Sequence, residues 1–272
     1  MAKNIYIGVD NVARKVKQPY IGINNIARKV KSGFIGVDNV ARQFYKSGIT
    51  LSSLAVGTVV YLKEGGTAQE YLVVNQGIPS GSSLYDASCN GTWLLRKDII
   101  ASSQYAANKT NVYENSDIHS WLNSTMLSKY DAYVQSLIKQ VKIPYRSGGG
   151  KSGTNQIGAN GLSCKLFLLS TTEVGCTTQN QVPDIGAVLS YFSGLGNGDE
   201  RKRVAYWSVG SNRWQHSWWT RTQLTDADTT FMLINANGSP SGWDAYQSAG
   251  VRPALIMPFD TAIDKNMNII TA

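Results

Sequence analysis

The first 48 residues repeat one pattern of apolar and polar positions three times, at an interval of 14 residues. The copies begin at Tyr6, Tyr20 and Phe34. In each copy, a short apolar run leads to a pair of Asp or Asn residues, and a second apolar run follows. Asp and Asn tolerate the left-handed backbone of a tight turn, so each copy predicts a small β-hairpin.

From Leu51 onward the pattern is typical of a globular body. Short β-branched or aromatic runs, bounded by Gly, Pro and Asn, predict strands at 56–62, 70–74 and 92–96. A continuous apolar run at 165–169 predicts a buried strand.

Helical periodicity is confined to a few short segments of the body. Ser116 is placed to cap a helix with apolar residues on one face. Apolar residues spaced i, i+3, i+4 and i+7 predict a second helix over 134–141, which Pro144 ends. We also expect a short helix at 185–192 and a long Gly- and Ser-rich loop at 146–161.

These elements predict two domains, an all-β region of three hairpin-like units at 1–48 and an α+β body at 49–272. A hairpin of 14 residues cannot bury a core by itself. We therefore expect residues 1–48 to act as an anchor or oligomerisation region, which docks on a larger assembly or stacks with other copies.

Charge separates the same two regions. Residues 1–48 carry nine Lys or Arg and two Asp, whereas residues 49–272 carry 17 basic and 16 acidic side chains. A nearly neutral body argues against a nucleic-acid-binding protein. Only 16% of all residues are charged, which argues against coiled coil and favours a body rich in strands and loops.

Targeting signals and membrane spans are not predicted. No apolar run reaches the roughly 18 residues of a membrane span, and the N-terminus lacks the apolar core of a signal peptide. We expect a soluble chain that is made in the cytoplasm without a signal peptide and does not insert into a membrane.

The few thiol and imidazole groups do not predict a cofactor or a metal site. Cys89, Cys164 and Cys176 are an odd number with no CxxC spacing, which disfavours a disulfide framework or a zinc site. Two histidines, His119 and His216, are too few for a His-rich metal centre. We expect buried free thiols and no cofactor.

The segment 206–247 is crowded with aromatic and short polar residues, the chemistry of antibody paratopes. Rigid aromatic rings provide contact area, and short polar side chains provide adaptable hydrogen bonds. Arg221 and Arg252 are expected instead to brace backbone carbonyls or a buried carboxylate, and Trp219 and Phe231 to point into the core. The predicted ligand-binding residues are Tyr206, Ser208, Ser211, Asn212, Trp214, His216, Thr222, Thr225, Asp226, Asp228, Trp243, Asp244 and Tyr246.

Four segments of the body, in order, resemble motifs of one domain family that is abundant in gut bacteria and their phages. They are Ser116–Asn123, Lys165–Val174, Trp218–Thr222 and Gly250–Leu255. The family is similar to the C-type-lectin-like fold of formylglycine-generating enzymes and of the variable proteins of diversity-generating retroelements. The repeats of residues 1–48 resemble those at the N-termini of some phage tail proteins.

The resemblance implies a non-enzymatic receptor-binding protein, an adhesin of a phage or prophage tail tip. Its partners would be a host cell-surface protein or glycan and, through residues 1–48, a phage tail or another particle. The expected location is the virion or a cell-surface-associated particle, and the expected assembly is a homotrimer. The resemblance implies that any retroelement-driven variation would fall on the predicted ligand-binding residues other than Trp214 and Trp243, with Trp207, Trp218 and Trp219 as invariant scaffold.

Two other classes of function stay open. A carbohydrate-active enzyme would use Asp226, Asp228 or Asp244 as acid or base. A purely structural tail or surface subunit would pack the 206–247 face on a neighbour. Calcium-dependent sugar binding through 181–184 is disfavoured because the motif has an inserted Val, and no catalytic residue is predicted.

Overall fold

The computed structural model describes residues 6–9, 12–16, 19–23, 26–30, 32–37, 40–46, 49–80, 82–176, 185–195, 200–209 and 211–270. Over these residues, no helix combines the length and the apolar character that a membrane crossing requires.

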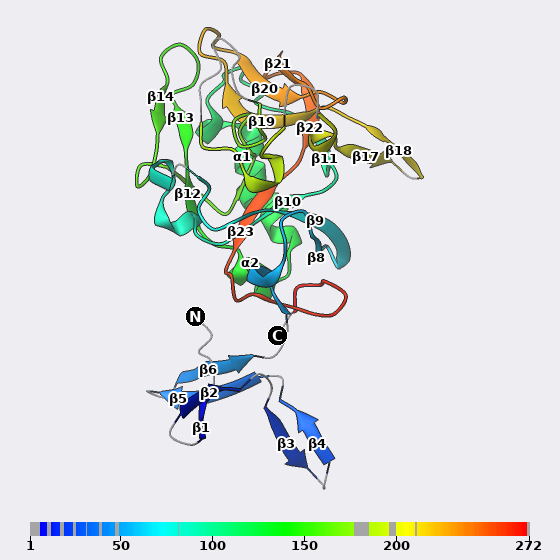
Figure 1. Cartoon of the computed structure of the whole chain (residues 1–272). Helices are drawn as coiled ribbons and strands as arrows, with labels where there is room; N and C mark the ends of the chain where they lie inside the picture. The colour runs from blue at the N-terminus through cyan, green and yellow to red at the C-terminus, as the bar shows by residue number, and fades with distance from the viewer. Residues whose placement is uncertain are drawn as a thin grey trace.

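Each N-terminal repeat forms a two-stranded antiparallel sheet of its own (Figure 1). The register is the same in the three copies, with a Gly opposite an Ala at the same position of each hairpin. The Asp and Asn positions predicted to form the turns lie outside the described residues. The strands are β1 (Tyr6–Val9), β2 (Val12–Lys15), β3 (Tyr20–Ile23), β4 (Ile26–Lys29), β5 (Ser32–Val37) and β6 (Val40–Lys46).

Two five-stranded sheets form the framework of the body. The first has the order β16 (Leu166–Phe167), β23 (Ala254–Met257), β10 (Thr92–Arg96), β9 (Thr67–Gln76) and β8 (Val59–Glu64). The second has the order β11 (Ala101–Gln104), β22 (Ser248–Val251), β19 (Trp218–Gln223), β20 (Thr230–Ile234) and β21 (Pro240–Asp244). Neighbouring strands are antiparallel in both sheets, apart from β19 and β22, which run parallel.

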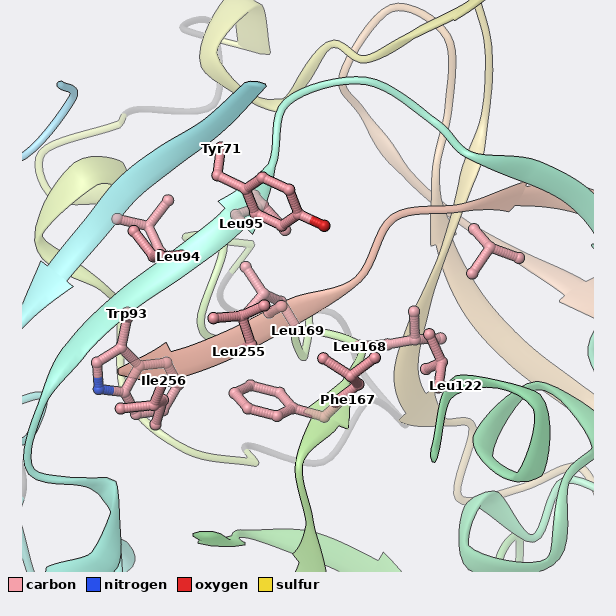
Figure 2. Close-up of a cluster of buried hydrophobic side chains, with 14 of the residues drawn as sticks. Tyr71, Trp93, Leu94, Leu95, Leu122, Phe167, Leu168, Leu169, Leu255 and Ile256 are labelled. Carbon is pink, nitrogen blue, oxygen red and sulfur yellow. The ribbon is translucent and has the colours of Figure 1, made fainter. Parts of the chain in front are cut away.

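The hydrophobic core includes residues of both sheets, and Figure 2 shows a part of it that packs on the first sheet. In β10 every residue is buried, as expected for a central strand with both faces covered. Leu94 lies opposite Leu255 across the β10–β23 pair, and Phe167 of β16 packs its ring against Trp93 at 5.6 Å. Leu122, from a helical segment distant in sequence, joins the same apolar cluster.

Short strand pairs and helices complete the body. The pairs are β7 (Ile49–Thr50) with β24 (Ala262–Ile263), β12 (Val141–Ile143) with β15 (Leu162–Cys164), β13 (Tyr145–Ser147) with β14 (Thr154–Gln156), and β17 (Tyr206–Val209) with β18 (Asn212–Gln215). The α-helices are α1 (Asp117–Trp121) and α2 (Ala132–Leu137). The 3₁₀ turns are Leu51–Ser53, Ser82–Leu84, Ala87–Cys89, Tyr113–Asn115, Leu127–Lys129, Ser190–Phe192 and Glu200–Arg203, and a π turn spans Leu122–Met126.

The predicted start of the helix at Ser116 is confirmed. The Ser116 hydroxyl accepts a hydrogen bond from the backbone N–H of His119 at 3.2 Å, which caps α1. The π and 3₁₀ turns continue α1, so residues 117–129 form one helical segment of 13 residues. Ile118 and Leu122 are buried on its inner face.

The prediction of an α+β body with a C-type-lectin-like fold is wrong. The protein is mostly β, with 39% strand against 17% helix, and its strands are divided among several small sheets. At the end of 134–141, the predicted helix is replaced because the backbone forms hydrogen bonds with strands that are distant in sequence.

Three segments differ from their predictions. The predicted helix 134–141 ends at Leu137, because the N–H of Lys139 donates to the carbonyl of Ile256 and Val141 pairs with Cys164 in β12–β15. The predicted loop 146–161 contains the β13–β14 hairpin. Of the predicted helix 185–192, only the 3₁₀ turn Ser190–Phe192 forms.

Candidate functional site

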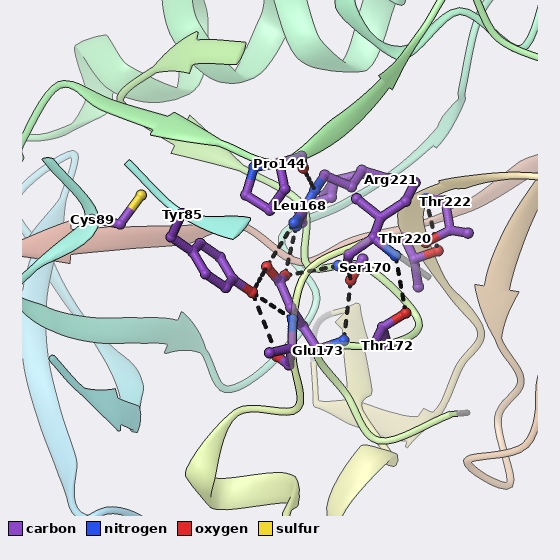
Figure 3. Close-up of polar contacts among 12 residues, drawn as sticks. Tyr85, Cys89, Pro144, Leu168, Ser170, Thr172, Glu173, Thr220, Arg221 and Thr222 are labelled. Carbon is purple, nitrogen blue, oxygen red and sulfur yellow. Dashed lines mark hydrogen bonds and ion pairs between the residues drawn. The ribbon is translucent and has the colours of Figure 1, made fainter. Parts of the chain in front are cut away.

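A fully buried ion pair between Arg221 and Glu173 holds the interior of the body together (Figure 3). Both terminal nitrogens of Arg221 donate to the two Glu173 carboxylate oxygens at 2.6 Å. Arg221 also donates to the carbonyls of Pro144 and Leu168 at 2.9 and 2.7 Å, and Tyr85 Oη donates to Glu173 at 2.9 Å. The prediction that Arg221 braces carbonyls or a buried carboxylate is confirmed on both counts.

Burial and the contacts of Glu173 act in opposite directions on Arg221. Burial by itself lowers the pKa of Arg221, but the charge and the hydrogen bonds of Glu173, together with the neighbouring Tyr85 and Tyr113, outweigh it and the pKa is raised. Burial and the Glu173 charge together raise the pKa of Tyr85 well above its ordinary value. Arg221 and Tyr85 therefore both stay protonated, which suits a structural network.

Arg252 is a second buried arginine, and among the described residues no carboxylate forms an ion pair with it. Its Nε donates to the carbonyl of Arg96 at 2.8 Å, and its guanidinium lies 4.9 Å from the ring centroid of Trp218. Burial lowers the pKa of Arg252 to about 10. Arg252 braces a carbonyl, as predicted.

Thr222 does not belong to a ligand-binding surface. This residue of β19 is fully buried, and its hydroxyl oxygen accepts hydrogen bonds from the N–H and the hydroxyl of Thr171 at 3.0 and 3.1 Å. Its predicted role in ligand contact is replaced by a structural one, since β19 is a central strand of the second sheet.

The β17–β18 hairpin carries most of the exposed candidates, and it extends away from the body in Figure 1. Trp207 lies opposite Trp214, and Tyr206 lies opposite Gln215. Side chains alternate between the two faces of a strand, so this register separates the hairpin into two faces. The aromatic face carries Trp207, Asn212, Trp214 and, just beyond the strand, His216; the opposite face carries Tyr206, Ser208, Arg213 and Gln215.

The aromatic face is built around Trp207. Its ring centroid lies 5.7 Å from that of Trp214 and 5.1 Å from that of His216. Trp207 also packs against the apolar core, whereas Trp214 keeps 41% of its surface exposed. His216 Nδ1 lies 2.8 Å from the carbonyl of Ser217, which can only accept, so Nδ1 is the donor and neutral His216 has an acceptor at Nε2.

The opposite face is held to the body by Arg213. Its guanidinium forms an ion pair with Asp98 at 3.0 Å and lies 4.0 Å from the ring centroid of Tyr206. The N–H of Ile99, next to Asp98, donates to the carbonyl of Tyr206 at 2.9 Å. The hairpin is therefore oriented by a charged contact and a backbone contact on the same side.

A second group of candidates lies at the turn after β21. The Asp244 carboxylate accepts hydrogen bonds from the hydroxyls of Thr229 and Thr230 at 3.0 and 3.2 Å. Tyr246 is 44% exposed, and its hydrogen bond with Asp244 raises its pKa. The ammonium of Lys109 lies 5.4 Å from the Tyr246 ring centroid.

The loop before β20 holds the other acidic candidates. Asp228 accepts a hydrogen bond from the backbone N–H of Lys151 at 3.2 Å, and its carbonyl accepts one from the N–H of Asn111 at 3.1 Å. Asp226 is exposed and Thr225 is half-buried. Trp243, in β21, is half-buried against the core. These contacts make the loop part of the packing between segments.

In the described part of the chain, no three His, Cys, Asp or Glu side chains are grouped to hold a metal ion. Cys89 and Cys164 are buried free thiols, and Cys176 is half-buried. The segment 181–184, weighed for calcium, lies outside the described residues.

A family model described as "Domain of unknown function (DUF6273)" matches residues 90–259, more than half of the chain. The chain belongs to the DUF6273 family. The match covers the second sheet and both groups of candidate residues, and it excludes the three N-terminal hairpins. Searches of curated proteins and of solved structures found no match to the chain.

Within the DUF6273 region, the two groups of candidates lie at opposite ends of the second sheet. The β17–β18 hairpin leads into Trp218, which pairs with Ile234 at the end of β20. Asp244 pairs with Thr230 at the start of β20. Strand β20 has five residues, so about 13 Å separates its ends. The predicted single face over 206–247 is two separate surfaces.

Sequence reasoning missed Arg213 and Gln215 of this DUF6273 hairpin. The available signal was the spacing of Trp207 and Trp214 around the central pair Gly210–Ser211, which suits a two-residue hairpin turn. That register places Arg213 diagonally across from Tyr206, where the structure shows their contact. Its partner Asp98 is distant in sequence and carries no such signal.

Proposed function

We propose that this DUF6273 protein is a non-enzymatic ligand-binding protein, an adhesin, which contacts its ligand through the β17–β18 hairpin. The observation that supports the proposal is the contrast between the two sides of the hairpin. One side is held to the body by Arg213 and Asp98, and the other leaves Trp214 in solvent. A pre-oriented aromatic side chain loses little freedom on binding, which is why Trp is common at binding hot spots.

In this proposal, the N-terminal hairpins attach the protein to a larger particle. A two-stranded hairpin is marginally stable alone, and Tyr20, Ile21 and Ile26 of the second copy are exposed large hydrophobic residues. Three copies in one chain suit multivalent attachment. The particle would be a phage or prophage tail on which the protein is displayed as a homotrimer. The ligand would be a host-surface protein or glycan.

Hydrogen bonds of the acidic candidates support the binding function over an enzymatic one. Asp228 accepts a hydrogen bond from the backbone of Lys151 in a segment distant in sequence, and Asp244 accepts hydrogen bonds from two Thr hydroxyls across the β20–β21 pair. Neither is aimed by these contacts at a shared reacting atom. Their described contacts therefore favour stabilisation of the loop and the turn.

The test uses the fluorescently labelled full chain on a panel of bacterial strains, with binding measured by flow cytometry. Saturable binding to at least one strain is expected to be lost with Trp214→Ala and retained with Tyr246→Ala, an exposed aromatic at the other end of the sheet. Asp228→Asn and Asp244→Asn should leave binding unchanged. Binding that survives Trp214→Ala but is lost with Tyr246→Ala would move the site to the other surface.

Retroelement diversification stays a separate prediction. Sequencing the gene and its flanks across isolates would support it if substitutions are confined to the candidate positions and match adenines of a nearby template repeat. Substitutions that are spread evenly along the chain, without such a template, would argue against diversification. The protein would then be an adhesin with a constant binding surface.

A further inference from the structure

Trp214 has the geometry of a stacking platform rather than of a packing residue. Its ring leans on Trp207 at a centroid distance of 5.7 Å and an interplanar angle of 57°. Trp207 is in turn held by the core and by His216. The ring is thus supported from one side while 41% of the residue remains in solvent. An indole face carries partial negative charge, which attracts polarised C–H groups.

Two hydrogen-bonding side chains flank Trp214 along the same face. Asn212 precedes it by two residues and is exposed, and His216 follows it by two residues and is half-buried. Residues two apart on a strand are about 7 Å from each other, so the two groups stand on either side of the indole. Asn212 both donates and accepts, and neutral His216 offers an acceptor at Nε2.

The hairpin offers no unpaired charge to an ionic ligand. Arg213 is the one charged residue in the sequence 206–215. It projects on the opposite face, where Asp98 pairs with it at 3.0 Å and the Tyr206 ring covers it at 4.0 Å. A phosphate or a carboxylate would have to displace Asp98 to reach it.

We infer that the aromatic face of the β17–β18 hairpin binds a neutral pyranose sugar, with the sugar ring stacked on Trp214 and its hydroxyls bonded to Asn212 and His216. A pyranose matches both features, because its axial C–H groups form an apolar face and its hydroxyls project from the ring edge. This inference rests on the proposed function and deepens it by naming the ligand class, a glycan rather than a protein.

The experiment places the full chain on a printed array of neutral and acidic glycans and then titrates the best neutral glycan by calorimetry. Trp214→Ala is expected to lower the affinity at least about tenfold, as for a binding hot spot. Trp214→Phe, which keeps a smaller aromatic face, should lose less. Asn212→Ala should weaken binding by a smaller factor, and Tyr246→Ala is the matched control that should change nothing.

Thermal unfolding of each variant separates loss of binding from loss of fold, and Trp214→Phe carries the test if Trp214→Ala unfolds. Binding to acidic glycans alone, or to no glycan on the array, would overturn the inference. If no glycan is bound while Trp214→Ala still abolishes binding to bacterial cells, the inferred ligand class is wrong and the proposed function stands. If Trp214→Ala changes neither glycan nor cell binding, both fail.

Discussion

Two arginine–carboxylate pairs of this protein share the same chemistry and differ in their surroundings. Arg221 and Glu173 have side chains that are 0% exposed, whereas those of Arg213 and Asp98 are 46% and 32% exposed. The buried pair has lost its water and depends on its partners, so removing one member leaves an uncompensated charge. The exposed pair is screened by solvent and contributes little to stability. The first holds the fold and the second orients a surface.

The comparison also shows how little local sequence distinguishes the two roles. Arg213 and Arg221 are eight positions apart, and both lie within a few residues of tryptophans. The two arginines differ in the strand that they occupy, since β19 is central in a five-stranded sheet and β18 belongs to a two-stranded hairpin.

The largest effect is expected from Arg221→Met. The substitution leaves the Glu173 carboxylate buried without its partner, and we expect the free energy of unfolding to fall by about 3–5 kcal/mol. Urea unfolding followed by circular dichroism measures it. The double variant Arg221→Met with Glu173→Leu should recover much of the loss because no buried charge remains. A loss below about 1 kcal/mol in the single variant would contradict the structural role of the pair.

The next largest effect is expected from Trp207→Ala, which removes the support of the hairpin. Half-burial of Trp207 against the core places the loss of unfolding free energy near 2 kcal/mol, below that of a fully buried Trp. Trp214 would also lose its neighbouring ring, so the tryptophan emission should shift to the red. Unchanged emission from the folded variant would show that Trp214 is not held by Trp207.

A smaller effect is expected from pH, through His119. Burial lowers the pKa of His119 below its ordinary value of 6.5, so the unfolded chain takes up the proton at a higher pH than the folded chain. The unfolding free energy should therefore fall as the pH drops below about 6.5. His119→Gln should flatten this decline, measured by urea unfolding at a series of pH values. An equally steep decline in the variant would assign it to other groups.

The smallest effect on stability is expected from Asp98→Asn. The exposed ion pair contributes about 0.2–1 kcal/mol, so the urea midpoint should barely move. Arg213 would lose its partner, however, and trypsin should cleave after Arg213 several-fold faster. Lys97→Gln is a neighbouring control that leaves Asp98 in place. A large loss of stability would show that the Arg213–Asp98 pair stabilises the fold as the buried Arg221–Glu173 pair does, which would contradict the contrast between the two pairs.

Local signals predicted several elements well. The strand at Thr92–Arg96 and the helix start at Ser116 are confirmed, since the first is a continuous apolar run and the second has a capping hydroxyl. The hairpin form of the three repeats also followed from their pattern. Each of these depends on residues close together in the sequence.

Other segments depended on partners distant in sequence. Helical spacing over 134–141 could not show that Ile256 would bind the backbone at Lys139. The Gly- and Ser-rich composition of 146–161 predicted a loop, although pairing of Tyr145 with Gln156 makes it a hairpin. The short polar side chain of Thr222 predicted a ligand contact, but this residue is buried because β19 is a central strand of the second sheet.

The repeat hairpins, the nearly neutral charge of the body, and the aromatic and polar composition of the segment 206–247 follow from the amino-acid sequence alone. Which of those residues face solvent depends on the packing of the folded chain. Strand order buried Thr222, and the length of β20 separated Asp244 from the β17–β18 hairpin. Composition is a property of one segment, whereas exposure depends on every segment that packs against it.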